Sequence, residues 1–137
     1  MATFVLKDAH LTIDSVDVSD HIVSITTTLE QAAVPDTNMG DDSDEFLTGL
    51  KNGNFTVNFS QDFAASEVDA TLWSIYDGDA AVAFVIKPTS DAVAATNPSY
   101  TGNCILTSYS PIDGSVGDKA GAPVSFQVTG DVTRNTS

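Results

Sequence analysis

Two segments of the chain alternate strictly between apolar and polar residues, and this pattern constrains the fold most. Residues 55–60 and 124–129 both follow it. The apolar positions are Phe55, Val57 and Phe59 in the first segment and Val124, Phe126 and Val128 in the second. A period of two places alternate side chains on opposite faces of a β-strand. The pattern therefore predicts two strands, each with one buried and one solvent-facing side.

Weaker alternation predicts further strands over residues 21–29 and 104–109. The run Ala80–Ile86 is apolar on both faces, which predicts a strand covered from two sides. With so few helical signals, we expect a mainly β fold: a two-sheet β-sandwich or part-open barrel with one flanking α-helix. The 137 residues fit a single domain, 1–137, with a short C-terminal tail, 134–137.

One segment, from about Ser66 to Tyr76, has the features of a helix. Ser66 is a candidate N-cap, and acids in the first turn suit the positive end of the helix dipole. Gly78 suits the position after the last turn. The apolar face would consist of Val68, Leu72, Ile75 and Tyr76, with Trp73 at the edge of the core.

A long connection, Glu30–Thr48, shows weak periodicity and contains an acidic run over residues 41–45. A connection of this length in a small domain tends to be functional or disordered. We interpret residues 30–48 as a long loop. Its apolar members are Val34, Pro35, Met39, Phe46 and Leu47.

The charge balance argues against several functions. The chain has 19 acids and 5 scattered bases, for a formal net charge of −14. Nucleic-acid binding needs cations that displace counterions, so it is disfavoured here. There is no apolar run of membrane-spanning length and no recognisable secretory signal, so we expect no membrane contact and synthesis in a cytoplasm. Cys104 is the single cysteine, and we expect a buried, unreactive thiol.

Catalytic and metal-binding patterns are missing from the sequence. No Gly-x-Ser-x-Gly motif occurs, and the two histidines, His10 and His21, fall in different predicted strands. The acidic run fails the EF-hand spacing. A looser calcium cage remains an alternative to a solvated loop face, using Asp41, Asp42, Asp44 and Glu45. We therefore predict no enzyme activity, no catalytic or cofactor-binding residues, no metal site and no cofactor.

Four short segments carry a resemblance to a known family. They are Gly49–Lys51 leading into the strand at residues 55–59, the helix segment Asp69–Trp73, Asn97–Tyr100 and the closing Val128–Arg134. Together with the order of elements from Phe4 to Arg134, they resemble the major tail tube proteins of phages with long, non-contractile tails (the siphovirus type). None of the four segments is a catalytic signature.

The resemblance implies a structural subunit of the virion tail. Six copies would form a ring, with one sheet of each copy lining a channel, and rings would stack into a tube around a tape-measure protein. The tube would lie between tail terminator and tail-tip proteins, would be assembled in the host cytoplasm and would conduct DNA from capsid to host without binding it specifically. The acid excess suggests a negative channel wall that repels phosphates.

The resemblance also assigns a role to the connection at residues 30–48, which would reach a neighbouring subunit or ring. Its five apolar residues, Val34, Pro35, Met39, Phe46 and Leu47, would then be buried on assembly. The alternative is that they pack back on their own domain.

Two other functions remain open from the sequence. The chain could be a carbohydrate- or receptor-binding β-sandwich in which Trp73, Tyr100 and Tyr109 form a sugar platform. It could also be a head decoration or head–tail joining protein, which forms rings or attaches to capsids without stacking.

Overall fold

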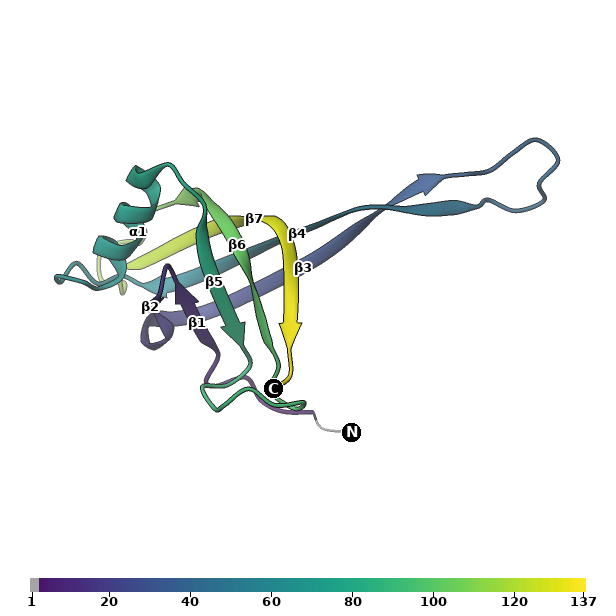
Figure 1. The fold of residues 1–137 in the computed structure, drawn as a ribbon. Coiled ribbons are helices and arrows are strands. Elements are labelled where there is room, and N and C mark those ends of the chain that lie inside the picture. The colour runs from purple at the N-terminus through teal and green to yellow at the C-terminus, as the bar shows by residue number, and fades with distance from the viewer. Residues whose placement is uncertain (1–2) are drawn as a thin grey trace.

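The computed structural model describes residues 3–137 and is mainly β, with one α-helix (Figure 1). In chain order the elements are β1 (His10–Ile13), β2 (Val16–Asp17), the short 3-10 helix η1 (Ser19–His21), β3 (Ile22–Pro35), β4 (Phe46–Ser60), α1 (Val68–Gly78), β5 (Val82–Lys87), β6 (Ser99–Tyr109) and β7 (Gly121–Asn135). Within the described part of the chain, no helix is long and apolar enough to cross a membrane.

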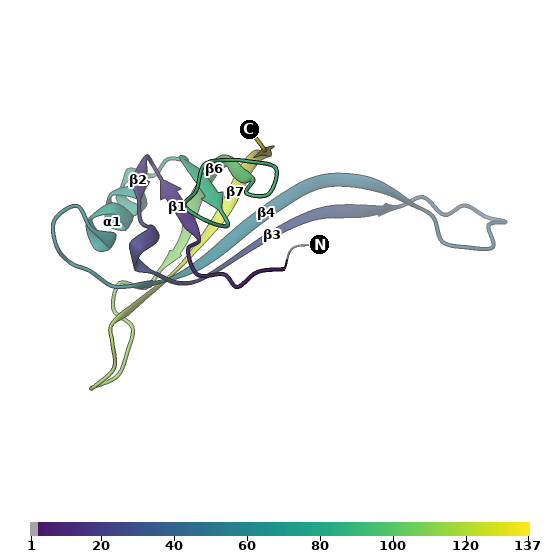
Figure 2. The same cartoon turned by 90° about the horizontal axis from the view of Figure 1, so that it is seen from below.

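All seven strands belong to one antiparallel sheet in the order β2-β1-β5-β6-β7-β4-β3. The sheet curls so that its two ends approach each other, but no ladder between residues 3 and 137 joins β3 to β1 or β2 (Figure 2). The predicted mainly β fold with one flanking helix is confirmed. Its strands form the part-open barrel of that prediction and not two separate sheets.

The core lies inside the curl and contains the alternating residues predicted to be buried. Phe55, Phe84 and Phe126 form its aromatic centre, with ring centroids 5.0 Å and 4.7 Å from Phe55. α1 lies at one end of the curled sheet and adds its buried face to this cluster (Figure 1). Burial on this scale supplies most of the stabilisation of a small domain.

The helix is confirmed, but its boundaries and one of its core residues differ from the prediction. It spans Val68–Gly78 and buries Val68, Thr71, Leu72 and Ile75, whereas Tyr76 is exposed. Ser66 is not the N-cap, because its backbone is left-handed (φ 63°) and the cap position falls on Glu67. The C-cap is Asp79, also left-handed, so Gly78 is the last helical residue. Trp73 is exposed beside Tyr76, with the two rings 5.5 Å apart.

The prediction that residues 80–86 form a strand covered on both sides is wrong. β5 begins at Val82 and buries only one face, through Phe84 and Ile86, whereas on the other face Ala83 is exposed and Val85 is half-buried. Because α1 lies at the end of the curl, no element of the described chain covers the outer face of β5. Ala83 and Val85 on that face are apolar and so gave the pattern of a strand buried on both sides, although neither is fully buried.

The interpretation of residues 30–48 as a loop is also wrong for most of its length. β3 continues to Pro35 and β4 begins at Phe46, with register pairs from Leu29↔Gly53 to Pro35↔Phe46. This two-stranded extension projects far from the body (Figure 1). We call residues 30–52 the ribbon and residues 36–45 its tip. The pairing was hidden in the sequence because both faces of the ribbon are exposed, so no apolar alternation marks it.

Candidate functional site: an exposed ribbon and two connected grooves

Strand continuity places the five predicted contact residues on the outer part of the ribbon. Val34 faces Leu47 and Pro35 faces Phe46 in the β3–β4 register, and Met39 lies in the tip. All five are exposed, and none belongs to the core cluster. They therefore do not pack back on their own domain. Leu50, which the sequence reasoning missed because it counted β4 only from residue 55, is 87% exposed on the same ribbon.

The tip is ordered by its own hydrogen bonds. The amide of Asp36 donates to the carbonyl of Glu45 (2.7 Å), and the amide of Asn38 donates to the Asp41 carboxylate (2.7 Å). Gly40 takes a positive φ of 93°, which closes the turn. The tip thus presents a defined shape at a distance from the body (Figure 1).

The outer edge of β3 is unpaired along its whole length. β3 forms a ladder only with β4 among residues 3–137, so its other edge carries free amide and carbonyl groups. The same holds for β2 at the opposite end of the sheet, but that strand has only two residues. Long open edges are sites at which another chain can add a strand.

Two grooves lie on the curled sheet. The first has a volume of about 410 Å³ and lies at the base of the ribbon, between Lys51 of β4, Tyr100 of β6 and Arg134 of β7. The second has a volume of about 390 Å³ and is mostly apolar, lined by Phe4, Leu6, Ile25 and Ile86 among others. Leu29 and Tyr100 line both, so the two grooves adjoin each other, and we call them the connected grooves.

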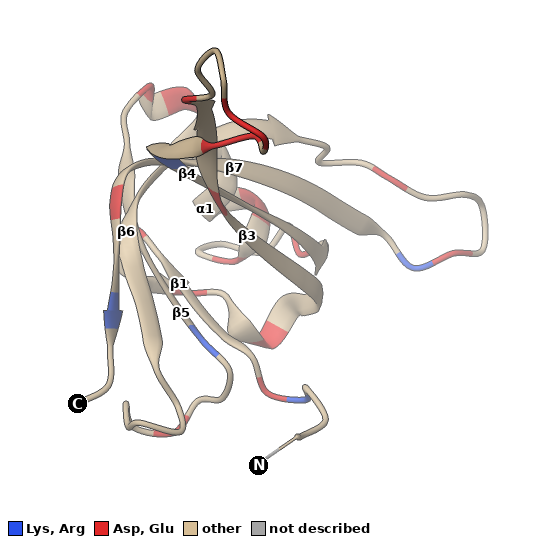
Figure 3. Ribbon diagram, turned by 90° about the vertical axis from the view of Figure 1, so that its right-hand side faces the viewer, with Lys and Arg blue, Asp and Glu red and all other residues tan. Residues whose placement is uncertain are grey.

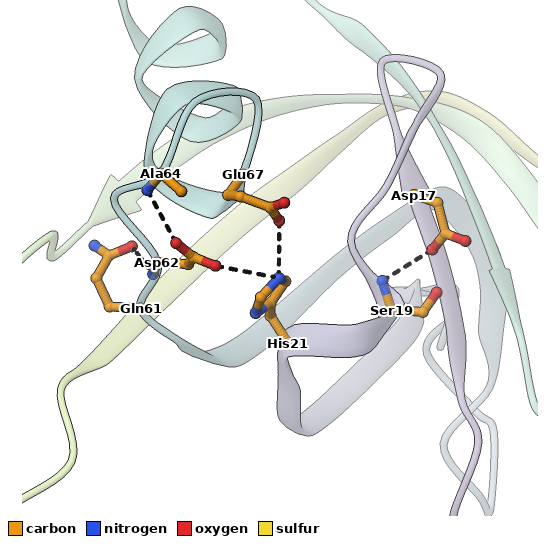
Figure 4. A network of polar contacts seen from close by, with 7 residues as sticks. All are labelled: Asp17, Ser19, His21, Gln61, Asp62, Ala64 and Glu67. Atoms are coloured by element: carbon orange, nitrogen blue, oxygen red, sulfur yellow. Dashed lines mark hydrogen bonds and ion pairs between the residues drawn. The ribbon is translucent and has the colours of Figure 1, made fainter.

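A separate polar cluster joins the start of β3 to the helix (Figure 4). His21 Nε2 lies 3.0 Å from Glu67 Oε2 and 3.9 Å from Asp62 Oδ2. Asp62 Oδ1 also accepts a hydrogen bond from the amide of Ala64 (2.9 Å). These contacts hold the β4–α1 connection against η1, which accounts for the cluster as a structural contact.

The same three residues form the one group in the described chain that could hold a metal ion, with ligand atoms within 4.8 Å of one another. The acids once considered as a calcium cage, Asp41 to Glu45, do not converge in this way. His10 is apart from His21 and contacts Thr12 and Ser19 instead. The sequence could not reveal the group because His21 and Glu67 are 46 residues apart.

The remaining candidate groups are not arranged for chemistry. Burial raises the pKa of the Cys104 thiol to about 12, so it is protonated at neutral pH. Burial also raises the pKa of Tyr109 to about 12, and its hydroxyl donates to the Asp69 carboxylate (2.7 Å). Both groups are therefore protonated at neutral pH.

The three aromatic residues considered as a sugar platform are not gathered on one surface. Tyr100 and Tyr109 lie near opposite ends of β6, which at about 3.3 Å per residue separates them by roughly 30 Å. Trp73 lies on α1.

No protein-family model matches the sequence, and no curated protein matches it. Solved structures do match the fold. A chain of the virion of a native gene transfer agent particle superposes with a TM-score of 0.80 at 14% identity, over 98% of this chain and 100% of that one. A chain of the SPP1 tail tube has a TM-score of 0.74 at 12% identity, over 95% and 77%. A chain from the tail of an empty gene transfer agent particle, refined with helical C6 symmetry, has a TM-score of 0.70 at 14% identity, over 85% and 83%. The chain therefore has the fold of the SPP1 tail tube subunit.

Proposed function

We propose that the protein is the structural subunit of a phage-type tail tube. The observation that carries this is the fold shared with tail assemblies over nearly the whole chain. In this role, copies form rings, and rings stack into a tube whose channel conducts DNA. By analogy with the six-fold tail of the gene transfer agent, the ring has six copies. The protein acts in the virion tail, is assembled in the host cytoplasm and has no enzyme activity.

The exposed ribbon supports this role. A two-stranded hairpin is at best marginally stable in water, and large apolar side chains on it make it a poor surface for a monomer. On assembly, Val34, Pro35, Met39, Phe46 and Leu47 become buried against a neighbouring copy. The open edge of β3 can be completed by the same kind of contact, since a closed ring satisfies edges that a monomer leaves free.

The charge supports passage of DNA without binding. Six copies at −14 each carry −84 formal charges, which repel phosphates if the acids line the channel. A channel wall lined by Lys51, Lys87 or Lys119 would contradict this part of the proposal. Partners of the tube would be a tape-measure protein inside it, a terminator at one end and tail-tip proteins at the other.

Electron microscopy and sedimentation of the purified chain test the proposal. We expect concentration-dependent rings or tubes for the wild type and loss of both in the ribbon variant Phe46→Ser/Leu47→Ser. Ile112→Ser/Val116→Ser is the matched control, because it removes two exposed apolar residues outside the ribbon. Rings that never stack would indicate a head-decoration or joining role. Uniform monomers that bind glycans would contradict the proposal and indicate a carbohydrate-binding module.

A further inference from the structure

The few basic residues of this acidic chain are concentrated at the two connected grooves. Lys51 and Arg134 line the first groove and Lys87 lines the second, so three of the five bases lie there. Glu30 and Asp131 are the acids in the same lining, which leaves the grooves at +1 in a chain of −14.

None of these three bases forms an ion pair with an acid of residues 3–137. The ion pairs between residues 3 and 137 involve His21 alone. The Lys87 ammonium donates to the backbone carbonyl of Asp91 (3.0 Å) and takes part in no ion pair of the described chain. Lys51 and Arg134 are exposed at the groove surface. Their charges are therefore free to pair with acids of another molecule.

The tip of the ribbon has the complementary composition. Its acids are Asp36, Asp41, Asp42, Asp44 and Glu45, and it contains no base (Figure 3). Directly beside them on the ribbon lie Val34, Phe46 and Leu47. The grooves likewise place an apolar surface beside a charged one. The apolar groove, with Phe4 and Leu6, meets the groove of Lys51 and Arg134 at Leu29 and Tyr100.

The tip cannot reach the grooves of its own chain. Leu29, which lines both grooves, is at the base of the ribbon, and Pro35 marks the start of the tip. At about 3.3 Å per residue, the strand carries the tip roughly 20 Å away from the groove. Paired strands do not fold back over such a distance without breaking their ladder.

We propose that the connected grooves are the docking surface for the ribbon tip of a second copy of this chain. In this contact Lys51 and Arg134 face acids of the tip, and the apolar groove covers Val34, Phe46 and Leu47. The contact joins two different surfaces, so it propagates from copy to copy, which is the geometry of closed rings and stacked tubes. The inference rests on the proposed function and adds to it the receiving surface of the ribbon.

Charge reversal with rescue tests this docking surface. Lys51→Glu/Arg134→Glu reverses the groove, Asp42→Lys/Asp44→Lys reverses the tip, and a third variant combines the four changes. The matched control for the groove is Lys7→Glu/Lys119→Glu, which reverses the two bases that line neither groove. Asp113→Lys/Asp118→Lys is the control for the tip, since it reverses two acids of another exposed loop. The readout is the critical concentration for assembly, measured by sedimentation, with electron microscopy of the product.

We expect each reversed surface to raise the critical concentration by at least about tenfold, because charges at the contact then repel. The variant with all four changes should have a critical concentration close to that of the wild type. Both control variants should also assemble at nearly the wild-type concentration. A different outcome is that the wild type assembles while the variant with all four changes keeps a critical concentration as high as that of either double variant. In that case the docking surface is wrong and the proposed function stands. A wild type that stays monomeric at every concentration would overturn the proposed function, and the docking surface with it.

Discussion

β3 and β4 run through both the body of the domain and the ribbon, yet the two regions are stabilised by different contacts. In the body, β4 carries Phe55, Val57 and Phe59, which are almost completely buried and pack against β7 and α1. In the ribbon, the same strand carries Phe46, Leu47 and Leu50, which are exposed. The β3–β4 ladder runs through both regions, with one register shift in each, between Ile22 and Ser24 and between Gln31 and Ala33. Backbone pairing alone therefore does not distinguish the two regions. The difference shows that the body is stabilised within the chain, whereas the ribbon lacks an apolar partner until another molecule supplies one.

Hydrogen exchange should show the largest difference between the two regions. In a free subunit, amides of the ribbon are expected to exchange at least about 10³-fold faster than amides of residues 54–60, because only the latter need global unfolding to open. In assembled particles the ribbon should become protected. Equal exchange of the ribbon in the two forms would contradict its burial on assembly.

Truncating one phenylalanine in the body and one in the ribbon should lower the free energy of unfolding by amounts that differ by several kcal/mol. Phe55→Ala is expected to cost about 3–5 kcal/mol in the free energy of unfolding, since it empties the centre of the aromatic cluster. Phe46→Ala, at 59% exposure against 0% for Phe55, should cost less than about 0.5 kcal/mol. Urea denaturation of the subunit under non-assembling conditions measures both. A large loss for Phe46→Ala would mean that the ribbon contributes to the body.

Alkaline pH should weaken the body and leave the ribbon unaffected. Burial raises the pKa of Cys104 from 9.0 to about 12, so the protonated thiol is favoured in the folded state. Stability from this group is complete below pH 9 and falls as pH rises toward 12, by at most about 1.4 kcal/mol per pH unit. Tyr109 acts in the same direction above pH 10. Denaturation of the wild type and of Cys104→Ala across this range should show a shallower slope in the variant.

The smallest effect concerns the turn between β2 and η1. Hydrogen bonding from Ser19, whose amide lies 2.9 Å from the Asp17 carboxylate, lowers the pKa of Asp17 below 3.8. This contribution is complete above pH 3.8 and is lost as pH falls through the lowered pKa of the folded state. Asp17→Ala should cost about 1 kcal/mol or less at neutral pH, and the difference from the wild type should shrink in acid. Asp118→Ala, an exposed acid without a side-chain hydrogen bond in the structure, is the comparison.

The sequence predicted the elements whose two faces meet different environments. The strands at residues 55–60 and 124–129 and the buried side of α1 followed from apolar periodicity, because each has one side in the core. The ribbon could not be predicted in this way, since its residues are solvent-exposed on both faces. The prediction that β5 is buried on both faces was wrong for a related reason. Apolar composition does not show whether another element is present to cover a face.

The candidate site was predictable in part. Exposed apolar residues in an acidic segment already indicated that Val34, Pro35, Met39, Phe46 and Leu47 need a partner. The grooves could not be found from the sequence, because Phe4, Tyr100 and Arg134 meet only after the sheet curls. The same applies to the cluster of His21, Asp62 and Glu67, in which a turn meets a helix terminus.

The continuity of β4 has a consequence for the thermal behaviour of the protein. Its first half lies in the ribbon and its second half holds the core, with no break between residues 46 and 60. A molecule that binds the first half therefore also restricts the second, and binding to the folded form alone raises the melting temperature of the entire chain. Heat resistance should thus increase with the degree of polymerisation, even though every contact made in polymerising lies outside the core.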